Sequence, residues 1–142
     1  MADAHKAFSE ETNPKAKVIL IVEDDDNIGN LLEEALRIGT LYQPVRVADG
    51  LAALKLIHSL KPDLIIIDYQ LPHMNGLDLY DHLRTISGFE EIPVLFMTAS
   101  TSMPWDQIKR RKLAALSKPF KVITVLQTIE KLLTAGSVDL NS

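Results

Sequence analysis

The chain has 142 residues, 46% apolar and 24% charged, with a formal net charge of −4. This length and composition predict one globular domain, and the absence of cysteine excludes disulfides and zinc–thiolate sites. No apolar run approaches the ~20 residues of a membrane helix, and the acidic balance gives no footprint for general nucleic-acid binding. We therefore expect a cytoplasmic protein that acts without nucleic acid or membrane.

Five apolar runs predict β-strands along the chain. They are VILIV at 18–22, VRV at 45–47, LIII at 64–67, PVLFMT at 93–98 and AALS at 114–117. Continuous runs of Leu and β-branched residues are typical of strands that are buried on both faces of a parallel sheet. We expect residues 1–16 and 135–142 to be flexible tails, so that the domain covers residues 17–134.

A helix is predicted after each strand. Apolar residues from Ile28 to Leu36 recur with helical period before a stop at Gly39. Asp49 is a suitable N-cap for a helix to about Leu60. The turn LPHMNG at 71–76 precedes a helix to about 86, a short basic helix covers 104–113, and a last helix runs from after Pro119 to about 133.

The alternation predicts an α/β fold, a doubly wound (βα)5 flavodoxin-like sandwich around a five-stranded parallel sheet. In such sheets a ligand site lies at the carboxyl ends of the strands. Four strands end in polar residues: Glu23 and Asp24 after the first, Asp68 after the third, Thr98 after the fourth and Lys118 after the fifth.

These residue types fit a site for a hard cation and a phosphoryl group. Neighbouring carboxylates repel each other unless a cation lies between them, and Mg²⁺ prefers carboxylate, water and phosphoryl oxygens. Asp68 could act as a nucleophile, Thr98 could donate a hydrogen bond to a phosphoryl oxygen, and Lys118 could neutralise its charge.

Each residue also has a purely structural explanation. The run Glu23–Asp26 could complement a helix dipole, Asp68 could cap a turn, Thr98 could be a loop hydroxyl, and Lys118 could be a surface charge. If all four structural explanations were correct, four unrelated polar residues would have to gather at one sheet edge by coincidence. The sequence therefore favours the site.

Four motifs in order carry a family resemblance. VILIVEDDDNIGNLL, PDLIIIDYQLPHMNGLDL, IPVLFMTAS and LSKPF together resemble the receiver domain of bacterial two-component response regulators, over about residues 17–134. The resemblance implies a single-domain, chemotaxis-regulator-like response regulator. Such a protein signals through a downstream protein target, as a monomer or a homodimer, and is not a turnover enzyme.

The resemblance also implies residue roles. Asp68 would accept a phosphoryl group from a histidine kinase or a histidine phosphotransfer protein. Asp24 would bind Mg²⁺ directly, Glu23 would hold it through water, and Asp68 and the backbone carbonyl of Gln70 would complete the ligands. Thr98 would be the switch hydroxyl, and Lys118, preceding a cis bond to Pro119, would pair with the phosphoryl group. Gln70 and Ser100 would tune dephosphorylation.

The chain departs from the family pattern near its fifth strand. Ala115 stands where the family usually has an aromatic switch residue, and RRKLAALS replaces a Gly-Ala-Asp-rich stretch. We therefore expect the switch to use displacement of residues 99–113. The basic run Lys109–Lys112 is either a solvated helix face or a contact for an acidic partner, and Trp105 is either a packing residue or a partner anchor.

Two other functions remain as alternatives. A haloacid-dehalogenase-like phosphatase would also use an Asp nucleophile and Mg²⁺. Such phosphatases resemble one another in a DxD pattern at the nucleophile strand, in which the second Asp is the acid/base. Here Gln70 stands in place of that second Asp, which argues against turnover. A degenerate receiver that acts only as a docking module is disfavoured because every acceptor-site residue is present.

Overall fold

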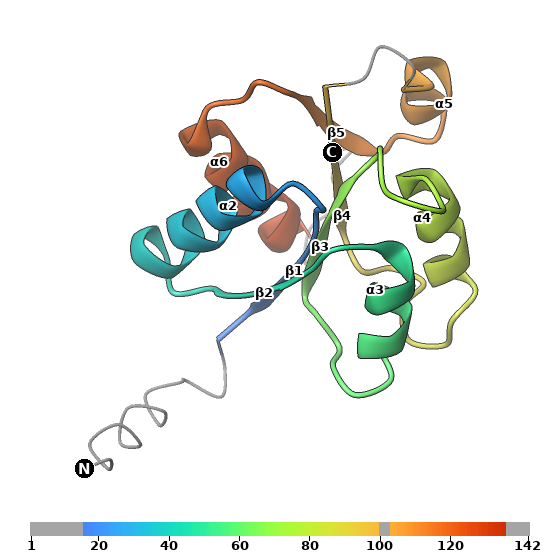
Figure 1. The fold of residues 1–142 in the computed structure, drawn as a ribbon, viewed down its shortest axis with the longest axis horizontal. Helices are drawn as coiled ribbons and strands as arrows, with labels where there is room; N and C mark the ends of the chain where they lie inside the picture. The colour runs from blue at the N-terminus through green and yellow to red at the C-terminus, as the bar shows by residue number, and fades with distance from the viewer. Residues whose placement is uncertain (1–15, 100–102, 136–142) are drawn as a thin grey trace.

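The computed structural model describes residues 16–99 and 103–135. Strands and helices alternate through these residues, as predicted (Figure 1). Their bounds are β1 Val18–Val22, α2 Asp26–Gly39, β2 Gln43–Val47, α3 Gly50–Leu56, β3 Leu64–Asp68, α4 Gly76–Arg84, β4 Val94–Thr98, α5 Trp105–Arg110, β5 Ala114–Ser117 and α6 Val122–Thr134. The expected tails lie almost entirely outside the described residues.

The five strands form one parallel sheet in the order β2-β1-β3-β4-β5. The chain winds outward from β1 to β2, then crosses to β3 and winds the other way. The switch point therefore lies between β1 and β3. This topology confirms the predicted doubly wound fold and places Glu23 and Asp68 on neighbouring strands.

Each face of the sheet has its own apolar core, because successive side chains in a strand point to opposite faces. Leu20, Ile67 and Phe96 pack on the face that α3, α4 and α5 cover. Ile21, Ile66 and Met97 pack on the face that α2 and α6 cover (Figure 1). All residues of the central strands β3 and β4 are buried, which explains the apolar runs LIII and VLFM before their polar last residues.

Polar residues define the helix starts. Asp25, Asp49 and Asn75 are N-caps whose side chains accept backbone N–H bonds from the first turns of α2, α3 and α4. The cap at Asp49 and the end of α2 at Gly39 were both predicted. No helix in the described part of the chain is long and apolar enough to cross a membrane.

Some boundaries differ from the prediction. Helix α3 ends at Leu56, and the chain continues to Leu60 in hydrogen-bonded turns. Helix α5 covers 105–110 instead of 104–113, and Lys112 takes a positive φ of 54° before β5. Strand β2 begins earlier than predicted, at Gln43, because an edge strand tolerates Pro44.

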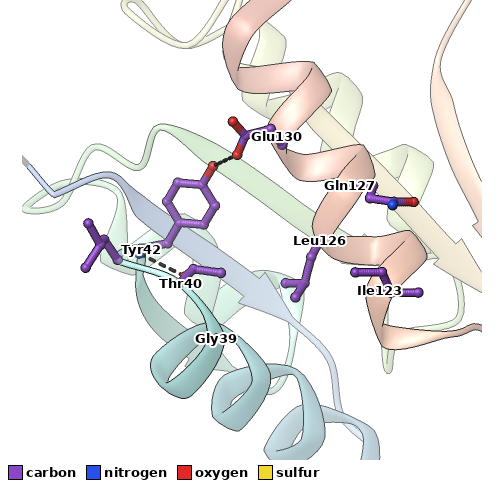
Figure 2. A pocket seen from close by; sticks show the side chains of 8 residues that line it. Gly39, Thr40, Tyr42, Ile123, Leu126, Gln127 and Glu130 are labelled. Atoms are coloured by element: carbon purple, nitrogen blue, oxygen red, sulfur yellow. Dashed lines mark hydrogen bonds between the residues drawn. The ribbon is translucent and has the colours of Figure 1, made fainter.

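A hydrogen bond joins the β2 edge of the sheet to α6. The Tyr42 hydroxyl donates to Glu130 Oε1 at 2.8 Å, beside a groove between α2 and α6 (Figure 2). Partial burial and the adjacent Glu130 carboxylate raise the pKa of Tyr42 from 10.0 to about 12. Since the folded-state pKa is the higher one, the stabilisation is complete below pH 10 and is lost as the pH rises towards 12.

We expect substitution of Glu130 by Gln to lower the pKa of Tyr42 towards 10, because the amide carries no charge. The ultraviolet absorbance of tyrosinate during an alkaline titration measures this pKa, and Tyr42→Phe identifies the contribution of Tyr42. An unchanged pKa in Glu130→Gln would contradict the contribution assigned to the Glu130 carboxylate.

Candidate functional site

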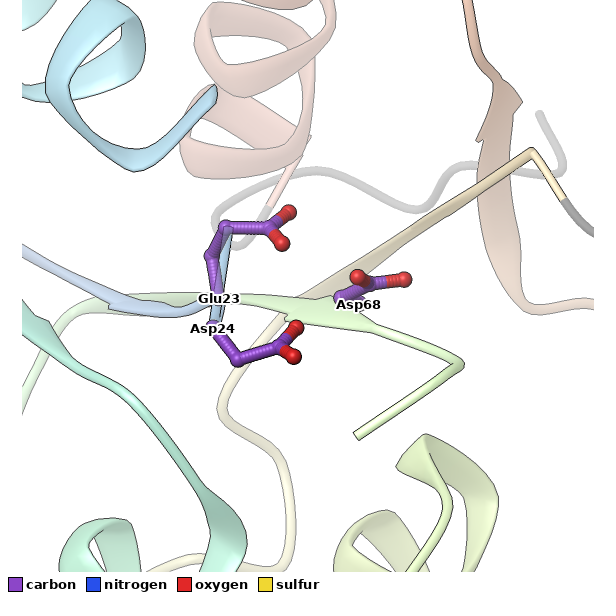
Figure 3. A group of neighbouring side chains, drawn as sticks. All are labelled: Glu23, Asp24 and Asp68. Atoms are coloured by element: carbon purple, nitrogen blue, oxygen red, sulfur yellow. The ribbon is translucent and has the colours of Figure 1, made fainter. Parts of the chain in front are cut away.

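Three carboxylates meet at the carboxyl edge of the sheet, at the switch point. Glu23 and Asp24 follow β1, and Asp68 is the last residue of β3. One oxygen from each lies within 4.8 Å of the others (Figure 3). Glu23 is 2% exposed and Asp68 is 5% exposed, whereas Asp24 is exposed, so the group opens to solvent on one side.

Lys118 follows β5, the edge strand two places from β3, and brings a positive charge to these carboxylates. Its Nζ lies 3.0 Å from Glu23 Oε1 and 3.2 Å from Asp68 Oδ2. Burial alone lowers the pKa of Lys118, but the hydrogen bond to Glu23 and the charge of Asp68 outweigh burial and raise it. Lys118 therefore keeps its positive charge at neutral pH.

The pKa of Glu23 is raised, first because burial disfavours the charged carboxylate and also because Asp68 is nearby. Hydrogen bonds from the Asp25 N–H and from Lys118 act in the opposite direction without reversing the shift. One ammonium group thus faces three carboxylates. The surplus negative charge, carried entirely by oxygen atoms, matches the donor set that Mg²⁺ prefers.

Thr98 and Gln70 lie beside Asp68. Thr98 ends β4, the strand next to β3, and is 1% exposed. The Lys118 N–H donates to the Thr98 carbonyl at 2.8 Å, which ties the lysine to that strand. The Gln70 N–H donates to Asp68 Oδ1 at 3.1 Å. The Lys118–Pro119 bond is cis, as expected.

The predicted site residues that the structure describes all lie at one edge of the sheet, and some of the purely structural explanations also hold. Asp25 caps α2 and Asp26 pairs with Arg46, so only Glu23 and Asp24 of the acidic run face Asp68. Asp68 does accept a turn hydrogen bond, from Gln70. Ser100 lies outside the described residues.

Two residues beside the site were missed by sequence reasoning. Arg46 of β2 donates to the Glu23 backbone carbonyl. At Gly76, the first residue of α4, a Cβ would lie 2.7 Å from the Asp68 carbonyl oxygen. The signal for Gly76 was a glycine directly after the N-cap Asn75, which was assigned only to a turn.

The four residues of the basic run Lys109–Lys112 are all exposed, although Arg111 also contacts α4. Trp105 packs against the core under α4 and α5. The Arg111 guanidinium pairs with Asp81 of α4 and lies 5.3 Å from the centre of the Tyr80 ring. Trp105 therefore has the packing role that was one of its two predicted alternatives.

The profile of the response regulator receiver domain family matches residues 19–130. The chain therefore belongs to this family of signal-transduction domains from two-component systems. The family assignment agrees with the sheet order and with the acidic edge, and it confirms the predicted resemblance.

Curated relatives share this domain but differ in length. The polar-differentiation response regulator DivK of Brucella anthropi is 33% identical over 120 residues, which is 82% of this chain and 96% of DivK. The uncharacterised transcriptional regulatory protein YrkP of Bacillus subtilis is 44% identical over 85 residues, 59% of this chain but 34% of YrkP. The chain thus spans about a third of the length of YrkP and of the DNA-binding regulators MtrA.

Solved structures give the same fold. The chemotaxis response regulator CheY4 of Vibrio cholerae has a TM-score of 0.75 and 29% identity, covering 84% of this chain and 100% of CheY4. The receiver domain of the Pseudomonas aeruginosa sensor histidine kinase PA1611 has a TM-score of 0.73 and 24% identity, covering 84% of this chain and 98% of that one. That domain was solved with a magnesium ion coordinated in its active-site cleft.

Substitution of Asp24 by Asn should stabilise the metal-free protein. Asp24 is the carboxylate of the three for which no bond to Lys118 is found, so its neutralisation relieves repulsion without breaking an ion pair. We expect the free energy of unfolding to rise by at most ~1 kcal/mol, because Asp24 is exposed and partly screened. Chemical denaturation with a chelator present measures this change.

The same experiment with Mg²⁺ provides the control. Mg²⁺ should stabilise the wild type through binding to the folded state, and it should stabilise Asp24→Asn much less. A destabilised Asp24→Asn in the metal-free protein would contradict the repulsion inferred for this group.

Proposed function

We propose that the chain is a response regulator that accepts a phosphoryl group on Asp68 and signals through phosphorylation-dependent binding of another protein. The observation that carries the proposal is the position of Asp68. Its carboxylate is buried 3.2 Å from the ammonium group of Lys118, at the sheet edge that also carries Glu23 and Asp24. The donor is the phosphohistidine of a sensor histidine kinase or of a histidine phosphotransfer protein.

The transfer uses Asp68 as the nucleophile. A carboxylate oxygen of Asp68 forms a bond to phosphorus while the bond from phosphorus to the donor imidazole nitrogen breaks, and the electron pair remains on that nitrogen. Lys118 stabilises the negative charge of the phosphoryl oxygens, as a preorganised charge does in a shielded site. The Gln70 N–H holds one Asp68 oxygen and leaves the carboxylate in a fixed orientation.

The acidic group is suited to Mg²⁺. Glu23, Asp24 and Asp68 would hold the ion together with the backbone carbonyl of Gln70. Receiver domains bind Mg²⁺ in the active site, and the three carboxylates here supply the matching oxygen donors. When bound, Mg²⁺ supplies charge neutralisation for the attacking carboxylate and for the phosphoryl group.

Partners and location follow from this role as further parts of the proposal. The domain, residues 17–134, would work in the cytoplasm, where histidine kinases phosphorylate their receivers. Its output would be a protein contact that differs between the two phosphorylation states. Receiver domains are generally signalling modules and not turnover enzymes, which disfavours the phosphatase alternative.

Incubation with acetyl phosphate and Mg²⁺ should add one phosphoryl group to the wild type and none to Asp68→Asn. Intact-protein mass spectrometry detects the adduct. Chelation of Mg²⁺ should greatly reduce its formation, because the transferred charge is then not neutralised.

A chromogenic phosphate ester separates the alternatives. Steady multiple turnover of the ester would support a phosphatase and contradict our proposal. A wild type that stays unmodified by acetyl phosphate with Mg²⁺ would instead support a docking module without acceptor function.

We also propose that the switch moves the predicted segment 99–113, of which residues 100–102 lie outside the described part of the chain. Ala115 is half-buried in β5 and has no ring to rotate, so the signal from Thr98 needs another moving part. Helix α5 is short, has no side-chain N-cap bond, and is joined to α4 by the Arg111–Asp81 ion pair. A short helix whose ion pair to the neighbouring helix can be exchanged is suited to a two-state displacement.

Hydrogen exchange with and without beryllofluoride and Mg²⁺ measures this displacement. We expect altered amide protection across 103–113 in the wild type and no change in Asp68→Asn. Unaltered protection of this segment, in a wild-type protein that binds beryllofluoride, would contradict the proposed switch.

A further inference from the structure

Arg46 lies in β2, at the edge of the sheet, but its side chain reaches the backbone of the acidic site. Its Nε and Nη2 both donate to the carbonyl oxygen of Glu23, at 3.0 and 2.9 Å. Nη2 also lies 2.9 Å from Asp26 Oδ1. The Arg46 side chain is 14% exposed and Asp26 is 87% exposed, so the bonds to the buried Glu23 carbonyl are shielded from water but the pair with Asp26 is not.

The bonded carbonyl belongs to the peptide that joins the two acidic residues. Strand β1 ends at Val22, and the Glu23 N–H still bonds to the Val47 carbonyl of β2 at 3.1 Å. Glu23 is buried, and a buried carbonyl beyond the end of a strand needs a donor. Arg46 supplies two. Because a peptide unit is planar, fixing the Glu23 oxygen also fixes the backbone leading into Asp24.

Gly29 makes room for this contact. A Cβ at Gly29 would lie 2.1 Å from Arg46 Nε and 2.3 Å from Arg46 Cζ. The guanidinium therefore lies directly on the backbone of α2, where no side chain at position 29 would fit without moving it. Glycine inside a helix lowers helix stability, and here the open space is filled by the arginine.

We propose that Arg46, lying on Gly29, is a positioning residue that orients the Glu23–Asp24 peptide and thereby raises the Mg²⁺ affinity of the acidic site. The inference rests on the Mg²⁺ site of the proposed function. The direction of the effect expected on Mg²⁺ affinity is opposite to that of simple charge repulsion. The positive charge of Arg46 by itself opposes binding of a cation, so charge and positioning predict opposite effects when the arginine is removed.

A Mg²⁺ titration of Arg46→Gln tests the proposal. The shifts of the backbone amide NMR signals of Asp24, Tyr69 and Gln70 report the affinity without any phosphorylation. We expect about tenfold weaker binding than in the wild type, as is typical when a residue that orients metal ligands is removed. Binding as tight as in the wild type, or tighter, would overturn the proposal.

Gly29→Ala tests the same contact by an independent route. Alanine favours the helix more than glycine does, so this variant should fold, yet its methyl group displaces the guanidinium. We expect weaker Mg²⁺ binding again, and no additional weakening when Gly29→Ala is combined with Arg46→Gln. Wild-type affinity in Gly29→Ala, or additive losses in the double variant, would overturn the proposal.

One further variant and the behaviour of the wild type itself complete the experiment. Arg46→Lys keeps the charge but not the fork of donors, and we expect it to bind Mg²⁺ more weakly than the wild type; wild-type affinity in this variant would contradict a role for the fork. A wild type that fails to bind Mg²⁺ would overturn the proposed metal site itself. That outcome differs from a failure of the Arg46 proposal, in which the wild type binds and the variants bind equally well.

Discussion

One ammonium group in contact with two buried carboxylates is the interaction on which the functional edge depends. Glu23 and Asp68 are almost fully buried on neighbouring strands, where their charges repel each other and water cannot screen them. Lys118 lies between them at 3.0 and 3.2 Å. A single cation does not balance three carboxylates, so the site keeps the attraction for a metal ion that its proposed chemistry needs.

The sheet makes this arrangement possible. A switch point between β1 and β3 places the acidic residues side by side, and β4 and β5 bring Thr98 and Lys118 to the same edge. The backbone bond between Lys118 and Thr98 links the last two of these strands at the site. Both apolar cores lie behind this edge, and they hold the strand ends in register so that the polar residues keep their positions at the site.

Most of the fold could be predicted from the sequence because buried parallel strands need uninterrupted apolar residues, as in β1, β3 and β4. Helix ends were predicted less well. The end of α5 depends on Lys112 entering a left-handed conformation, and the residues of α3 beyond Leu56 form turns despite their apolar pattern. Such ends are set by tertiary contacts that periodicity does not report.

The site could be predicted as a set of residues but not as a geometry. Residue type and position after a strand were enough to select Asp68 and Lys118. Residue type and position alone do not separate Asp25, which caps a helix, from Asp24, which faces Asp68; only the family resemblance selected Asp24. The bond from Arg46 to the Glu23 carbonyl joins a strand edge to a helix glycine across the fold, and only a three-dimensional structure reveals such a contact.

The position of Lys118 in the chain has a consequence for synthesis and folding. It is separated from Glu23 by 95 positions and from Asp68 by 50, and it follows the last strand to be made. Until that strand docks, the growing chain holds its carboxylates without their cation, and contacts between distant residues are slow to form. Under the proposed function, the ability to accept a phosphoryl group therefore arises only when the sheet is complete, because a partly folded chain lacks Lys118 beside Asp68.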